Sequence, residues 1–220
     1  MPPSYALDDY LEAIYILDTE GVAVIGARVA DLLGVRAPSV TEALHRLEQR
    51  ELITQDDRRV IALTPQGRER AEGLIRVHRI VERWLTDVVG FDWAQADVEA
   101  HRLEHAMSGE VADRLSEMMG HPKTCPHGNP IPGNWITPTY FGLTLDQGHP
   151  GDKLVVERVL EHAEVDQKLL KYLWQYRILP GALVTMVDIV PGAGTITVQQ
   201  DQEQVQLGIR AASKIQVRPA

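Results

Sequence analysis

Three potential metal ligands stand close together in the stretch EAHRLEHAM, residues 99–107: His101, Glu104 and His105. On a helix, side chains three and four positions apart lie on one face, with Cβ atoms about 5–6 Å apart. Two imidazoles and a carboxylate would then converge on one point, and these groups are ligands of divalent transition metals. The stretch therefore predicts a metal site, with a solvated polar helix face as the competing interpretation.

Two further pairs of ligand-type residues have helical spacing. Asp9 and Glu12 are three positions apart, and His78 and Glu82 are four apart. Each pair alone is typical of a solvated helix face. Together with residues 101–105 they form an oxygen- and imidazole-rich set on three predicted helices, and facing helices of a bundle build metal sites from such residues. Cys125 and His127, two positions apart, indicate a metal only weakly, and we interpret Cys125 as a structural thiol.

The string HRLEH also matches H-x-x-E-H, a signature of zinc peptidases. In that interpretation His101 and His105 bind zinc and Glu104 is the general base. Such an enzyme needs a third ligand downstream and an open cleft. The amino-terminal pattern described below has no role in such an enzyme. A zinc metallohydrolase is therefore the alternative from a different functional class.

Composition sets the broad class of the protein. The chain has 220 residues, 44% of them hydrophobic, and one cysteine, so no internal disulfide forms. No apolar run approaches the roughly 20 residues of a membrane span, and the opening MPPSYALDDY lacks the pattern of a secretory signal. We expect a cytoplasmic protein. With a net charge of −9, any DNA binding must come from a local face.

The amino-terminal elements predict a winged helix-turn-helix. Apolar periodicity gives helices at 5–18, 26–34 and 38–50, and the segment after them reads as two strands with a turn at 56–59. In such modules the second helix of the pair enters the major groove. Pro38 suits its first turn. We expect DNA contacts from Pro38, Ser39, Thr41, Glu42, His45 and Arg46, and phosphate contacts from Arg28, Arg36, Arg50, Arg58 and Arg59; a solvated face and a charged hairpin tip are the alternative.

The remaining sequence predicts a mainly α fold with a small β domain. Helices expected at 65–89 and 92–119 carry apolar stripes for a core and a dimer interface. Five prolines from Pro122 to Pro138 indicate a loop or linker, and five β-rich runs with one helix at 165–176 predict a small barrel. The predicted domains are a DNA-binding domain at 1–64, a metal-binding and dimerisation domain at 65–120, a linker at 121–150 and an SH3-like domain at 151–220.

Several stretches in order resemble one protein family. They are DDYLEAIYIL, APSVTEALHRLEQRELI, RVHRIVERWL, RLEHAMSGEVADRL, HGNPIPG and EVDQ. The chain resembles the diphtheria toxin repressor family of metal-dependent transcriptional regulators over nearly its whole length. The resemblance implies a winged helix, a helical dimerisation domain and an SH3-like barrel. It implies a regulatory metal site at Asp9, Glu12, His78, His101, Glu104 and His105, and an ancillary site at His78, Glu82, Asp97, Glu164 and Gln167.

The resemblance also bears on the metal. Iron-responsive members have methionine at the position of Asp9 and cysteine at the position of His101. Manganese-responsive members have aspartate at the position of Asp9, as this chain does. His101 matches neither branch. Carboxylates suit Mn²⁺, so we expect Mn²⁺, with Fe²⁺ as the alternative and Co²⁺ or Zn²⁺ as ions that bind in vitro. The implied function is repression of metal uptake and homeostasis genes by a metal-bound homodimer on palindromic operators. A winged-helix regulator that senses an organic ligand is a further alternative.

Overall fold

The computed structural model describes residues 7–134, 142–161 and 166–220. Contacts divide the chain into two compact units, Met1–Val77 and His78–Ala220, and each has its own hydrophobic core. The boundary falls within one helix, α4 (Pro65–Trp84), which contributes to both units. Among the described residues, no helix is long and apolar enough to cross a membrane.

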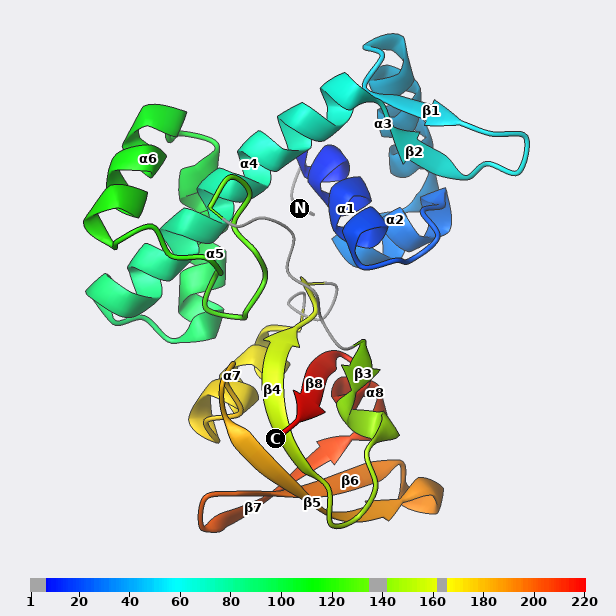
Figure 1. Cartoon of the computed structure of the whole chain (residues 1–220). Coiled ribbons are helices and arrows are strands. Elements are labelled where there is room, and N and C mark those ends of the chain that lie inside the picture. Colours follow the sequence, from blue (N-terminus) through cyan, green and yellow to red (C-terminus); the bar gives the residue numbers. More distant parts are fainter. Residues whose placement is uncertain (1–6, 135–141, 162–165) are drawn as a thin grey trace. The chain divides into compact units, whose positions relative to one another are not determined.

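The first unit is the predicted winged helix-turn-helix. It contains α1 (Leu7–Thr19), α2 (Gly26–Leu33), α3 (Ala37–Gln49) and an antiparallel hairpin of β1 (Ile53–Gln55) and β2 (Ile61–Leu63). The three helices pack around a shared core beside the hairpin (Figure 1). The predicted apolar stripes supply that core, and the members that are fully buried include Leu11, Ile14, Val29 and Leu47.

Local chemistry explains where these elements begin and end. Gly34 ends α2 in the left-handed conformation, with φ of 64°. Pro38 lies in the first turn of α3, where its missing N–H has no helical partner to lose. At the tip of the hairpin, the Asp56 carboxylate accepts hydrogen bonds from the backbone N–H groups of Arg58 and Val60, at 2.9 and 2.7 Å. These bonds fix the turn that presents the arginines of the hairpin.

The helical part of the second unit differs from its prediction at one point. α4 continues into the π-helix η1 (Leu85–Val89), which ends at Gly90 as predicted. One helix was predicted over 92–119, and that prediction is wrong: the structure has α5 (Trp93–Glu104) and α6 (Gly109–Met118). Ser108 starts α6 because its hydroxyl accepts a hydrogen bond from the N–H of Val111. The break leaves His105 as the carboxy-terminal cap of α5.

The carboxy-terminal part is the predicted SH3-like sheet domain. Six antiparallel strands run in the order β3-β8-β4-β5-β6-β7 and curl around a common interior (Figure 1). Inward side chains alternate along each strand, as in Val184 and Met186 or Ile196 and Val198. The elements are β3 (Leu143–Thr144), η2 (Leu145–Gln147), β4 (Lys153–Val159), α7 (Gln167–Gln175), β5 (Leu183–Val190), η4 (Pro191–Ala193), β6 (Thr195–Gln200), β7 (Glu203–Gly208), α8 (Ile209–Ala212) and β8 (Ile215–Pro219).

The helices and the barrel of the second unit share one core. Trp93 of α5 is buried in the same cluster as Leu170 and Leu173 of α7. The Trp93 ring also lies 6.0 Å from the ring of Trp174, measured between centroids. The residues predicted as a linker contain β3 and η2, so part of that segment belongs to the barrel. The division into four domains stays a prediction.

Candidate metal centre and nucleic-acid interface

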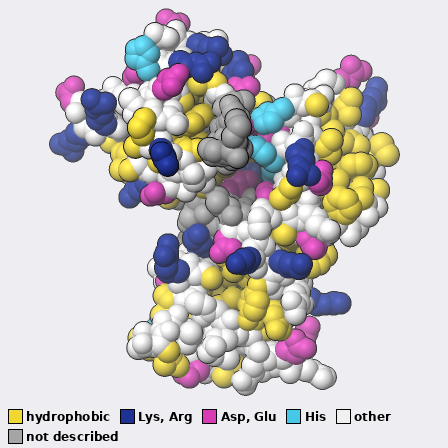
Figure 2. All heavy atoms as spheres, turned by 180° about the vertical axis from the view of Figure 1, so that it is seen from behind, with side chains coloured by type: hydrophobic (Ala, Val, Ile, Leu, Met, Phe, Trp, Pro, Cys, Tyr) yellow, Lys and Arg dark blue, Asp and Glu magenta, His cyan; other side chains and the backbone are white. Residues whose placement is uncertain are grey.

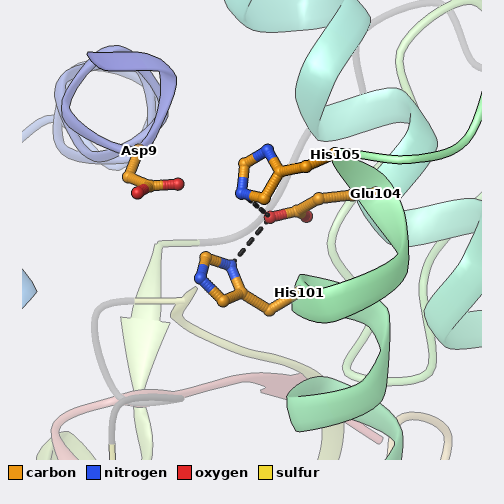
Figure 3. Close-up of side chains that lie close together, drawn as sticks. All are labelled: Asp9, His101, Glu104 and His105. Carbon is orange, nitrogen blue, oxygen red and sulfur yellow. Dashed lines mark ion pairs between the residues drawn. The ribbon is translucent and has the colours of Figure 1, made fainter. Parts of the chain in front are cut away.

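His101, Glu104 and His105, here called the first cluster, converge as the helical spacing predicted. The Glu104 Oε1 atom lies 2.7 Å from Nδ1 of His101 and 3.3 Å from Nε2 of His105. Figure 3 shows both imidazoles turned toward the carboxylate of Glu104 from the end of α5. Glu104 is buried, whereas His101 and His105 remain partly exposed to solvent. The cluster therefore has a buried anionic centre with two partly exposed imidazoles beside it.

Glu104 also connects the first cluster to α4. Its second oxygen, Oε2, lies 2.5 Å from Nδ1 of His78. The other ring nitrogen of His78, Nε2, lies 3.9 Å from Oδ1 of Asp97. Each nitrogen of His78 thus faces a different group of ligands. His78, Glu82 and Asp97 form the second cluster, whose ligand atoms lie within 4.8 Å of one another.

A third cluster joins residues that are far apart in the sequence. Glu82, Cys125 and His127 also offer ligand atoms within 4.8 Å of one another, and all three side chains are buried. His127 Nδ1 lies 3.0 Å from Glu82 Oε1 and 3.9 Å from the Cys125 sulfur. Glu82 belongs to both the second and the third cluster. From the sequence, Cys125 and His127 indicated a metal only weakly, since nothing in their spacing points to a glutamate more than forty positions upstream.

Electrostatics hold the metal-free clusters in a charged state. Burial would lower the pKa of His78, but its hydrogen bond to Glu104 and the charge of that carboxylate raise it well above the usual value. Burial would raise the pKa of Glu104, but hydrogen bonds from His101 and His78 lower it to about 2. Likewise, burial opposes ionisation of Glu82, and the charge of His127 lowers its pKa. The raised pKa of His78 favours its protonated form, which places a positive charge beside Glu104 when no metal is bound.

The barrel contributes one predicted ancillary ligand to the second cluster. The side-chain amide of Gln167, at the start of α7, donates a hydrogen bond to Oδ2 of Asp97 at 2.5 Å. Burial raises the pKa of Asp97. Glu164, the other ligand predicted from the barrel, lies outside the described residues. The second cluster therefore has its own side chains on α4 and α5 and a hydrogen-bond partner on α7.

Asp9 and Glu12 are residues of the first unit. They lie three positions apart on α1, and both side chains are buried. The neighbouring Asp8 and Asp18 form ion pairs with the start of α4, through Arg70 and Arg68 respectively. These contacts orient α1 within the first unit.

The donor chemistry of the clusters fits divalent cations. The first cluster offers two imidazoles and a carboxylate, and the second offers one imidazole and two carboxylates. Such nitrogen and oxygen donors suit Mn²⁺ and Fe²⁺ and also accept Zn²⁺. The third cluster adds a thiol, which favours softer ions. Buried carboxylates packed this closely are costly without a compensating positive charge.

The exposed face of α3 forms the candidate nucleic-acid interface. A shallow hollow on this face is lined by Pro38, Thr41, Glu42, His45 and Arg46, all predicted for DNA contact. A neighbouring hollow between the helices and the hairpin is lined in part by Gln55 and Arg59. The other predicted residues are exposed as well: Arg28, Arg36, Ser39, Arg50 and Arg58.

A second exposed surface is apolar. The helical part of the second unit leaves large hydrophobic side chains in solvent, led by Met118 at 78% and Val88 at 61% exposure. Figure 2 shows hydrophobic side chains gathered on one side of the molecule. Apolar patches of this kind mark interaction surfaces. The exposed apolar residues of η1, α5 and α6 are Val88, Val89, Val98, Leu103, Val111 and Met118.

Comparison with known proteins gives a consistent result along the chain. Residues 4–60 match the model of the iron dependent repressor N-terminal DNA binding domain, residues 64–133 match its metal binding and dimerisation domain, and residues 143–219 match the FeoA domain. The iron-dependent repressor IdeR of Mycobacterium tuberculosis is 36% identical over 219 residues, covering 94% of each chain. The diphtheria toxin repressor of Corynebacterium efficiens is 34% identical, covering 90% of this chain and 88% of that protein.

Solved structures agree with these matches. A manganese-dependent transcriptional repressor in complex with manganese superposes with a TM-score of 0.86 at 29% identity, covering 98% of this chain and all of that one. The manganese regulator SloR superposes with a TM-score of 0.80 at 28% identity, covering 99% of this chain and all of that one.

Proposed function

Because the chain belongs to the diphtheria toxin repressor family of metal-dependent transcriptional regulators, we propose that it senses Mn²⁺ and represses metal uptake and homeostasis genes. The observation that carries this proposal is the convergence of His101 and His105 on the buried carboxylate of Glu104. The family consists of transcriptional repressors, so HRLEH supplies metal ligands here and the hydrolase interpretation loses its support.

We propose that Asp9 and Glu12 complete the regulatory site with the first cluster and His78. The support comes from two buried carboxylates on one face of α1 and from the family resemblance. A bound divalent cation would add positive charge close to the carboxylates of Asp9, Glu12 and Glu104. His101 and His105 would bind through ring nitrogens, and Glu104 through the oxygen that faces them.

The ligand set suggests how metal binding reaches DNA. α1 belongs to the DNA-binding unit, whereas His101, Glu104 and His105 belong to the second unit. A site shared by both would fix the position of the recognition helices in a dimer. Half-sites about 34 Å apart accept only certain spacings of those helices. Shifting the ratio of active to inactive protein from 1:99 to 99:1 requires about 10⁴-fold tighter metal binding to the active state. Ligands that are assembled only in the active state can supply this difference in affinity.

Two features favour Mn²⁺ as the physiological ion. The proposed regulatory site contains no sulfur ligand, since Asp9 and His101 stand where iron-responsive members have sulfur side chains. Carboxylate-rich sites suit Mn²⁺, whereas sulfur selects softer ions. Fe²⁺ remains the alternative that the same donors accept.

We further propose that the second and third clusters form the ancillary site, with Glu82 shared between them. In that arrangement Gln167 is held at the second cluster by its hydrogen bond to Asp97, and Cys125 and His127 enlarge the ligand set predicted from the sequence. The carboxy-terminal domain would then take part in metal binding as well as in folding.

The partners follow from the two exposed surfaces. The face of α3 and the hairpin arginines would contact the bases and phosphates of a palindromic operator. The apolar surface of η1, α5 and α6 would pair with its copy in a homodimer, whose two-fold symmetry matches the palindrome. A chain with net charge −9 binds DNA only through such a local face.

Fluorescence anisotropy with a labelled palindromic promoter fragment tests the proposal. The protein is titrated with Mn²⁺, with Fe²⁺ under anaerobic conditions and with Zn²⁺, each at buffered free concentration, and a chelator follows. Binding that requires metal, reverses with chelator and saturates at physiological free Mn²⁺ is the expected result. DNA binding that is unchanged by the chelator would instead favour a regulator that senses an organic ligand.

A further inference from the structure

The loop of residues 124–131, here called the Cys–His loop, carries Cys125 and His127 of the third cluster. Its ends are joined by an antiparallel bridge between Thr124 and Pro130. The N–H of Cys125 also donates to the carbonyl of Asn129, at 2.8 Å. The loop is therefore a closed turn, and its contacts with the rest of the second unit decide where its two ligand side chains lie.

Two arginines of α4 bind the backbone of this loop. Arg83 donates from Nε to the carbonyl of Thr124 at 3.0 Å and from Nη2 to the carbonyl of Cys125 at 2.7 Å. Arg79, one helical turn earlier, donates from Nη1 to the carbonyl of Pro130. The two guanidinium groups thus hold both ends of the loop against the helix that also carries Glu82.

The opposite side of the loop packs against β4. The N–H of Val159 donates to the carbonyl of His127 at 2.9 Å, and the side chain of Asn129 donates to the carbonyl of Val159 at 2.9 Å. Gly128 has φ of 91°, and a Cβ atom there would overlap the carbonyl oxygen of Glu157. The backbone of the loop therefore packs directly against the backbone of β4.

Arg79 further joins α4 to the barrel through a buried ion pair. Its Nε and Nη2 atoms each lie 2.7 Å from one oxygen of Glu161, and both side chains are almost fully buried. A bidentate guanidinium–carboxylate pair fixes the relative orientation of the two side chains as well as the distance between them. None of these contacts includes a candidate metal-ligand side chain, so none of them requires a bound metal.

We propose that Arg79 and Arg83 are positioning residues that hold Cys125 and His127 against Glu82 before metal binds. This inference rests on the proposed function only in treating the third cluster as a metal site. The ligands of the third cluster are then in place before metal binds. Metal binding there does not need to order any more of the backbone. Loss of a partner that orients metal ligands typically costs about 10–100-fold in metal affinity, and we expect that loss in Arg79→Met and Arg83→Met.

Hydrogen exchange of the metal-free protein provides the first test. Arg79→Met and Arg83→Met should raise amide exchange across the Cys–His loop at least about tenfold, in line with loss of hydrogen bonds that fix it. Arg102→Met is the matched control, because Arg102 pairs with Glu99 on the exposed surface of α5. Exchange in the loop that equals that of the control in both variants overturns the proposal.

Cobalt absorption provides the second test. Cys125 is the only cysteine of the chain, so sulfur-to-cobalt charge-transfer absorption reports Co²⁺ at the third cluster alone. The midpoint of this band should move about 10–100-fold to higher Co²⁺ in both variants and stay unchanged in Arg102→Met. An unchanged midpoint in both variants overturns the proposal even if exchange increases.

The two measurements separate the possible failures. A wild-type protein without the band refutes the metal role of the third cluster, while exchange still decides whether the arginines position the loop. Arg79→Met removes the guanidinium that pairs with the buried Glu161 carboxylate, which is strongly destabilising. If that variant does not fold, Arg79→Met/Glu161→Met removes both charges and must show the same exchange and band shifts, and Arg83→Met decides independently.

Discussion

Replacing Glu104 by glutamine should abolish the response to Mn²⁺. The change keeps the shape of the side chain and removes the charge at the centre of three imidazoles, whose nitrogens lie 2.5, 2.7 and 3.3 Å from its oxygens. The contacts with His101 and His78 lower the pKa of Glu104 from 4.5 to about 2. Since one pKa unit corresponds to about 1.4 kcal/mol, the surroundings favour the charged carboxylate by about 3 kcal/mol, and a divalent cation bound to the same imidazoles would replace their protons as the positive partner.

The assay compares Mn²⁺ midpoints for DNA binding by fluorescence anisotropy. Loss of an outer partner of a metal ligand costs up to about 100-fold in affinity, so loss of a charged ligand should move the midpoint by at least that factor. Glu99→Gln is the matched control, because Glu99 lies on the same helix and pairs with an exposed arginine. Thermal unfolding without metal verifies that both variants fold. A Glu104→Gln protein with the wild-type midpoint refutes the proposed site.

Four further changes test other parts of the molecule. Arg46→Ala should weaken DNA binding and lower the salt dependence by about one ion without altering Mn²⁺ affinity; an unchanged salt slope argues against a phosphate contact. Met118→Glu should shift the protein toward monomers in analytical ultracentrifugation, and an intact dimer places the interface elsewhere. Gly67→Ala should lower the unfolding temperature of the first unit, because the added methyl overlaps the Leu52 carbonyl. Asp97→Asn should remove one of the bound Mn²⁺ ions measured by titration, and unchanged stoichiometry contradicts an ancillary role.

Local pattern was sufficient to predict the elements of the first unit. The apolar spacing of α1 and the glycine that ends α2 act over one or two helical turns, so the sequence displays them directly. The break between α5 and α6 was missed because the apolar period continues through it. There the hydroxyl of Ser108 starts a new helix, and a serine inside a helical pattern is a weak signal by itself.

The candidate metal ligands also differ in how far the sequence could predict them. His101, Glu104 and His105 were predictable because one helix carries all three within two turns. The third cluster needed the fold, since Cys125 and His127 meet Glu82 only after the Cys–His loop packs between α4 and β4. The contact of Gln167 with Asp97 likewise depends on α7 packing against α5, and only the family resemblance indicated it.

Glu104 and His78 make the first two clusters electrostatically dependent on each other. One oxygen of Glu104 faces His101 and His105, and the other faces His78, whose second nitrogen faces Asp97. A positive charge at either cluster therefore changes the electric field at the side chains of the other, through the contact between buried Glu104 and partly buried His78. Burial matters here because charges in the interior are screened far less than surface charges. The proposed regulatory and ancillary sites are for this reason better regarded as one linked ligand network than as two independent sites.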